Sequence, residues 1–291
     1  MTFEQILPVA VVLMLGVAVQ AAVGFGAGLF SVPLLVWLRV PLPVAVGLVL
    51  TLVIVQTGFN CWQHRTELPW RSVLPVFLLR GASLPVGVAL MYAVTQLDVA
   101  RTKQVIGMVL LIILSLQTWC TVRPKQQIHW VWTVLAGSLS GVMAGMLGMG
   151  GPPLVLWLMA HDWPSVRQRI FLWLSFLLLV PFQAVLLMLA FGKPLMIALL
   201  LGFALTPAGL AAAWIGGQIG RRLSRPRLRM AMTLVLLGIA IQSIVGPLLR
   251  ADNRKGDDTA GPAERTTPAE YSAPAMRAAQ RMAGIVEADP G

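Results

Sequence analysis

Charge is scarce in this sequence, and the charged residues that it has lie in a few short stretches. Lys, Arg, Asp and Glu make up 11% of the 291 residues, whereas they form about a quarter of a soluble domain. Between residues 73 and 94 the only charge is Arg80, and residues 170–190 carry none. Because 57% of the residues are hydrophobic, no polar face remains to cover a soluble core. Uncharged apolar runs of this length are typical of transmembrane helices, since about 20 residues cross the hydrocarbon layer.

Other features are missing as well, and their absence excludes several function classes. The two cysteines, Cys61 and Cys120, do not form a metal-ligand spacing. The phosphate-binding pattern GxxxxGK(S/T) does not occur, which argues against a built-in ATPase. Acidic residues are effectively absent from the apolar segments, so the carboxylate cluster that a membrane-embedded enzyme would need is missing. We therefore predict that the protein is not an enzyme and that it holds no cofactor and no metal.

The excess of positive charge has a simpler reading than nucleic-acid binding. The net charge is +11, and the arginines cluster in short loops between apolar segments. A basic bias in such loops is the usual mark of membrane topology. The expected partners are the lipid bilayer and a small anionic substrate, with no nucleic acid. The sequence leaves open whether a second copy of the chain is also a partner.

The apolar segments predict an all-α polytopic membrane protein of about eight transmembrane segments. The first and the fifth segment are too long for one straight helix and too short for two complete ones. From residue 250 the composition becomes polar and rich in Pro, Gly and Ala, which predicts a disordered tail over 250–291. The apolar segments cover residues 5–38, 43–60, 73–94, 104–121, 130–160, 170–190, 195–215 and 230–249.

An internal repeat is the next prediction. When the chain is shifted by 124 residues, GFGA at 24–27 aligns with GMGG at 148–151. The two long apolar segments and the basic loops around residues 101 and 225 then also fall in register. We therefore predict two homologous halves, 1–124 and 125–249. Corresponding apolar segments that are both interrupted by Gly or Pro are a known pointer to the binding site of a secondary transporter.

The two Gly-rich motifs are GFGAGLFSVP at 24–33 and GMLGMGGPP at 145–153. Glycine and proline disfavour helix, and broken backbone survives in a membrane only inside protein or around a wet cavity. A helix that begins at such a break points N–H groups and a partial positive charge at its ligand. Two such breaks that face each other near the midplane would form a small anion site without any charged side chain.

Close helix packing is the alternative reading of the same glycines. Small residues four positions apart let two helices approach closely. Glycine pairs of this kind occur at 24 and 28, at 141 and 145, and at 216 and 220. The pairing of the two proline-linked motifs at matching repeat positions favours the site.

These motifs resemble those of the 4-toluene sulfonate uptake permease family, also called the sulfite exporter TauE/SafE family. The resemblance covers about residues 5–249 and rests on GFGAGLFSVPLL, HRTELPWR and GMLGMGGPPLVLWLMAHDWPSVRQR. Ala27 interrupts what is usually a fuller glycine triplet. The resemblance implies a permease with duplicated four-helix halves that moves sulfite, an organosulfonate or a related anion. It also implies that the residues at the family's motif positions line the pathway, namely Gly24, Gly26, Gly28, Gly148, Gly150, Gly151 and Pro152. We expect a location in a bacterial inner membrane.

Three polar residues at membrane depth complete the predicted substrate-binding set. Arg80 lies eight residues into an apolar run, and an intramembrane charge is a functional hypothesis by default. Alternatively, its side chain extends to the lipid headgroups. Gln20 and Gln56 could hydrogen-bond a desolvated anion or could bridge helices.

The resulting functional prediction is secondary transport of a small sulfur-containing anion by alternating access. Two alternatives are a membrane-embedded enzyme and a structural membrane subunit without transport.

Overall fold

The computed structural model describes residues 3–119, 129–222 and 233–243, and these residues form helices with no strand among them. The predicted polar tail at 250–291, the basic loop around residue 225 and Cys120 lie outside the described residues. The helices are α1 (Phe3–Val23), α2 (Ala27–Trp37), α3 (Leu42–Gln63), α4 (Trp70–Thr95), α5 (Val99–Trp119), α6 (Trp130–Leu147), α7 (Gly151–Met159), α8 (Ser165–Phe191), α9 (Lys193–Ala204), α10 (Thr206–Arg222) and a helix over Thr233–Ser243.

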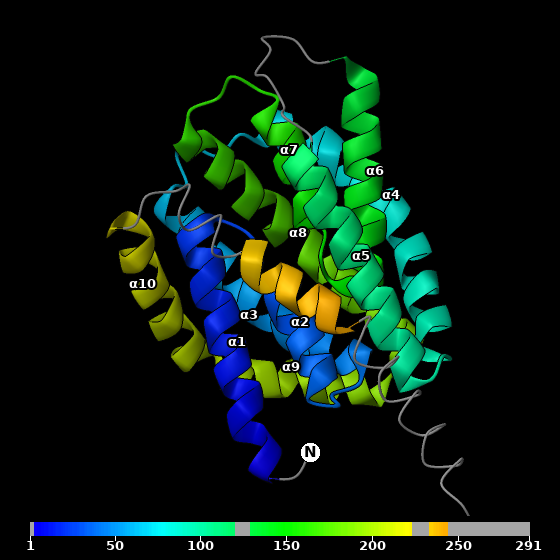
Figure 1. Ribbon diagram of the computed structural model, residues 1–291. Coiled ribbons are helices and arrows are strands. Elements are labelled where there is room, and N and C mark those ends of the chain that lie inside the picture. The colour runs from blue at the N-terminus through cyan, green and yellow to red at the C-terminus, as the bar shows by residue number, and fades with distance from the viewer. Residues whose placement is uncertain (1–2, 120–128, 223–232, 244–291) are drawn as a thin grey trace, which may run out of the picture. The chain divides into compact units, whose positions relative to one another are not determined.

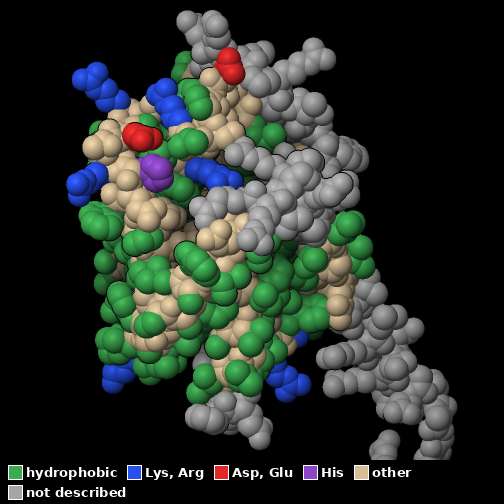
Figure 2. Space-filling view, turned by 90° about the vertical axis from the view of Figure 1, so that its left-hand side faces the viewer, with side chains coloured by type: hydrophobic (Ala, Val, Ile, Leu, Met, Phe, Trp, Pro, Cys, Tyr) green, Lys and Arg blue, Asp and Glu red, His purple; other side chains and the backbone are tan. Residues whose placement is uncertain are grey.

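Six of these helices, α1, α3, α4, α5, α6 and α8, are long and apolar enough to cross a membrane. The α9–α10 pair, bent by 59°, gives a seventh if it is one span. The all-α membrane architecture is therefore confirmed, with six or seven candidate spans among the described residues where about eight segments were predicted. On the face drawn in Figure 2, hydrophobic side chains form a broad band between two ends that carry Lys and Arg.

Each of the two long apolar segments is a helical hairpin, in which a short helix folds back along a long one. In the first, Ser31 on α2 donates to the carbonyl of Val12 on α1, over 3.2 Å. In the second, the indole N–H of Trp157 on α7 donates to the Thr133 hydroxyl on α6, over 3.0 Å. In each hairpin this hydrogen bond joins a residue of the short helix to a residue of the long helix that lies well before the break in sequence. The short helices therefore run antiparallel to α1 and α6.

The interruptions fall at the predicted glycine motifs, at residues 24–26 and 148–150. Gly24, Gly26 and Gly148 have φ values of 102°, 110° and 69°, which residues with a Cβ rarely adopt. The prolines of the two motifs do not interrupt the helices, although proline disfavours helix. Pro33 lies inside α2, and Pro152 occupies the first turn of α7, where a missing N–H costs no helical hydrogen bond.

Glycine-mediated contacts hold two long helix pairs together, α4 with α6 and α1 with α10 (Figure 1). A Cβ added to Gly145 on α6 would lie 2.5 Å from the carbonyl oxygen of Leu84 on α4. A Cβ added to Gly220 on α10 would lie 2.7 Å from the Cα of Ala22 on α1. The close-packing reading is therefore correct for the glycine pairs at 141 and 145 and at 216 and 220.

Two adjacent glycines on α10 provide a matched test of this contact. A Cβ added to Gly216 would collide with the carbonyl oxygen of Ala18 on α1, whereas one added to Gly217 meets nothing within 4 Å. We expect Gly216→Ala to lower the free energy of unfolding by about 2 kcal/mol through overpacking. Gly217→Ala should be neutral or stabilising by about 0.5 kcal/mol, because alanine is the better helix former. Thermal unfolding of the two purified variants measures the difference, and equal midpoints would contradict the α1–α10 contact.

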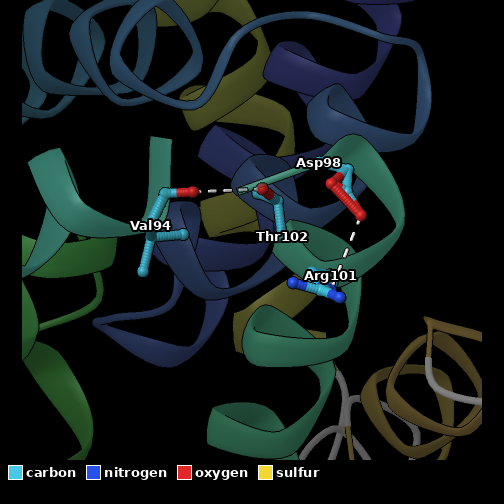
Figure 3. A network of polar contacts seen from close by, with 4 residues as sticks. All are labelled: Val94, Asp98, Arg101 and Thr102. Atoms are coloured by element: carbon cyan, nitrogen blue, oxygen red, sulfur yellow. Dashed lines mark hydrogen bonds and ion pairs between the residues drawn. The ribbon is translucent and has the colours of Figure 1, made fainter. Parts of the chain in front are cut away.

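The connection from α4 to α5 contains one of the few acidic residues, Asp98 (Figure 3). The Thr102 hydroxyl donates to the Val94 carbonyl over 3.2 Å and secures the turn. Beside it, Asp98 and Arg101 form an ion pair of 3.6 Å whose side chains are about two thirds exposed. An exposed pair of this kind contributes little to stability. The Asp98 carboxylate therefore lies in an exposed turn between two helices and not at membrane depth.

Candidate functional site

The two backbone breaks touch each other. A Cβ added to Gly28, the second residue of α2, would collide with the carbonyl oxygen of Gly148 in the second break. A Cβ added to Gly151 would lie 3.3 Å from the ring of Phe25 in the first break. Glycine at position 28 is therefore required by the close approach of the Gly148 backbone, and glycine at position 148 by its φ of 69°. The structure brings the two motifs together although more than 100 residues separate them along the chain.

A cavity of about 50 Å³ lies at this meeting point. One buried water needs roughly 15 Å³ of such space, so the cavity has room for a small ion or a few waters. Side chains from α3, α4 and α8 close it. Eight of the ten predicted site residues line it, namely Gln20, Gly26, Gly28, Arg80, Gly148, Gly150, Gly151 and Pro152.

Arg80 supplies the charge of this cavity. It is the eleventh of the 26 residues of α4, and its side chain is 0% exposed. The headgroup-facing alternative is therefore wrong for Arg80. Its Nη1 donates to the Ser175 hydroxyl over 2.6 Å and to the Ser175 carbonyl over 3.1 Å. The guanidinium also lies 5.3 Å from the centre of the Phe176 ring, while Nε and Nη2 have no hydrogen-bond partner.

No carboxylate among the residues that the structure describes forms an ion pair with Arg80. Residues 5–249 contain only three acidic residues, Glu67, Asp98 and Asp162, and all three are exposed in loops. The two ion pairs among the described residues join His64 to Glu67 and Arg101 to Asp98. A buried charge without a partner costs several kcal/mol, and two guanidinium nitrogens without acceptors add to that cost. An anion in the cavity would remove both penalties.

Neutral polar groups complete the lining. The Ala27 N–H at the start of α2 donates to Gln20 Oε1 over 3.3 Å, which leaves Gln20 Nε2 buried without a partner. The Gly28 and Leu29 N–H groups lie in the first helical turn, where no intrahelical acceptor exists. These donors could bind the oxygens of an anion together with Arg80.

The remaining two predicted residues do not line the cavity. Gln56 is buried on α3, and its Nε2 donates to the Val17 carbonyl of α1 over 3.5 Å. The helix-bridging alternative therefore describes Gln56. Gly24 lies next to the cavity, and a Cβ added to it would lie 3.5 Å from Cγ of Arg169 on α8.

Sequence reasoning missed the contribution of α8. Phe176 and Gln183 line the cavity, and Ser175 binds Arg80. Gln183 donates from Nε2 to the Ala144 carbonyl of α6 over 2.7 Å. The available signal was the presence of two polar side chains, at 175 and 183, within an uncharged apolar run.

Comparison with known proteins assigns the chain to a family. The family model described as "Sulfite exporter TauE/SafE" matches residues 9–243, which include both hairpins, Arg80 and α8. No match was found among curated proteins or among solved structures. With six or seven candidate spans in the part that the structure describes, the chain is a multi-pass membrane permease that belongs to the sulfite exporter TauE/SafE family.

Proposed function

We propose that this permease is a secondary transporter of a small sulfur-containing anion, such as sulfite or a short organosulfonate, in a bacterial inner membrane. The observation that carries the proposal is Arg80, a fully buried cation at a cavity formed by two backbone breaks, with no counter-ion within residues 3–119, 129–222 and 233–243. A guanidinium can bind an oxyanion through two parallel hydrogen bonds, and Nε and Nη2 are the two donors that lack acceptors. The size of the cavity favours a compact anion.

We further propose alternating access between two inverted halves, 1–124 and 125–249. The helix bounds support the repeat. When 124 is added to the residue numbers of α1, α2 and α3, their first and last residues fall within a few positions of those of α6, α7 and α8. The contact of α4 with α6 has its counterpart in the contact of α10 with α1. In Figure 1, α1 begins at the lower end and α6 at the upper end, which supports inversion. Inverted repeats are a recurrent architecture of secondary transporters.

The two rival functions lack such support. A structural subunit needs no charged cavity between its halves. A membrane-embedded enzyme needs a cluster of catalytic groups, and no group of three His, Cys, Asp or Glu residues that could hold a metal occurs within the described ranges.

Flux in proteoliposomes tests the proposal. We expect the full-length chain to carry labelled sulfite or methanesulfonate above the rate of protein-free vesicles. Gly150→Leu should abolish the flux, because its Cβ would lie 2.6 Å from the Ser140 carbonyl oxygen and 3.1 Å from Arg80 Nη2. Gly217→Leu, placed where nothing lies within 4 Å, is the matched control and should retain it. Equal rates for wild type and empty vesicles would overturn the proposal.

Arg169 provides a separate prediction about access to the cavity. It is partly buried on α8, and Nη2 donates to the Ala22 carbonyl at the end of α1 over 3.5 Å. We propose that anions enter the cavity from the side of Arg169, where a cation raises the local anion concentration. We expect Arg169→Gln to raise the apparent KM for the anion by roughly threefold at low salt, with little change in maximal flux. The difference should shrink in high salt, and a salt-independent effect would contradict this role.

A further inference from the structure

We infer that the cavity selects a singly charged oxyanion over a doubly charged oxyanion of the same shape. The inference rests on the proposed function, because it concerns the anion carried at that site. The selectivity follows from the number of fixed charges around the cavity, because few ionisable side chains lie near it.

Arg80 is the only ionisable side chain in the lining of the cavity among the described residues. Gln20 and Gln183 are neutral, and so is Ser175, which binds Arg80. Arginine keeps its proton in proteins, so the empty cavity carries a single positive charge. One negative charge on the ligand brings the site to neutrality. A second would leave a net negative charge at membrane depth, which the low dielectric penalises strongly.

The helix ends do not change this count. The N-termini of α2 and α7 each present a partial charge of about +0.5. Each of them follows a break of only three residues, at 24–26 and 148–150, so the C-terminal ends of α1 and α6 bring about −0.5 to the same places. The four ends therefore cancel to first order. At α7 the donor supply is further reduced, because Pro152 and Pro153 have no N–H.

Other cations are not placed to neutralise a second charge. Arg169 contacts the end of α1 and Gly24 but does not line the cavity. The remaining described basic residues lie in loops or near helix ends, where water and salt screen them. The partnerless Nε2 of Gln20 can donate a hydrogen bond to an oxygen of either anion, so it does not discriminate between them.

Methanesulfonate and sulfate make a matched pair of probes, because both are tetrahedral at sulfur and they differ by one charge. The experiment measures how each inhibits flux of labelled sulfite into vesicles that contain the full-length chain. We expect methanesulfonate to inhibit at a concentration at least about tenfold lower than sulfate. Inhibition by sulfate at an equal or lower concentration would overturn the inference and leave the transport proposal standing, and so would sulfite flux that neither probe inhibits. Absence of any anion flux would instead overturn the proposed function itself, and this inference with it.

A charge added to the lining should shift the preference. Gln20→Lys puts a second cation beside the cavity, and we expect the inhibition ratio to move at least about fivefold toward sulfate. Gln168→Lys adds the same charge on α8 outside the lining and should leave the ratio unchanged. Equal shifts in the two variants would contradict a local charge count. If Gln20→Lys fails to fold, the ratio measured with the wild-type chain still decides.

Discussion

Replacement of Arg80 by methionine is expected to abolish transport and to stabilise the fold at the same time. Anion flux should fall at least about 100-fold, which corresponds to about 3 kcal/mol, because truncating one partner of a buried charge pair costs that much or more. In anion-free buffer the unfolding midpoint should rise. Replacing a buried ion pair by apolar side chains of similar volume often stabilises by about 1–4 kcal/mol, and in the described part of the chain Arg80 is buried without a counter-ion.

The opposite signs of the two effects separate a ligand-binding role from a structural one. A residue that only holds α4 to α8 through Ser175 would lose stability and transport together. Arg80→Lys keeps the charge without the paired donors of a guanidinium, so we expect it to retain part of the flux. Arg71→Met removes one exposed cation from the first turn of the same helix and should leave flux within about twofold of wild type. Normal transport by the Arg80→Met protein would refute the site.

The location of the breaks could be predicted from the sequence because glycine acts locally. The φ values at 24, 26 and 148 are those that glycine adopts more readily than other residues, so its spacing already marked the interruptions. The direction taken after each break could not be predicted. It depends on tertiary contacts such as Ser31 with Val12 and Trp157 with Thr133, which local propensity does not encode.

The surroundings of Arg80 were out of reach for a similar reason. Its position within an apolar run marked it as unusual, but its partner Ser175 lies 95 residues away. A polar residue in an apolar helix can face lipid, a neighbouring helix or a cavity, and only the packing of the helices decides which. The same ambiguity applied to Gln20 and Gln56, of which one lines the cavity and the other bridges α3 to α1.

The meeting of the two breaks gives the second large expected effect. In Gly28→Ala the new methyl group would collide with the Gly148 carbonyl oxygen. That oxygen belongs to a residue with φ of 69°, which holds the turn at the end of α6 and cannot rotate away without opening the second break. We therefore expect a loss of about 3 kcal/mol in the free energy of unfolding, at the upper end of ordinary overpacking.

The methyl group would also move the cavity wall, so flux by the folded fraction of Gly28→Ala should fall together with its stability. Gly58→Ala is the matched control on α3, because its Cβ would meet its nearest neighbour, a Leu177 methyl, at 3.7 Å. That is ordinary contact, so this variant should keep both flux and unfolding midpoint. The Cβ is fixed to the backbone of one hairpin, and the atom it meets is a backbone carbonyl oxygen of the other, so no side-chain rotation relieves the collision. A Gly28→Ala protein as stable and as active as Gly58→Ala would show that the two hairpins do not touch in the membrane. It would also contradict the anion cavity, because residues of both breaks line it.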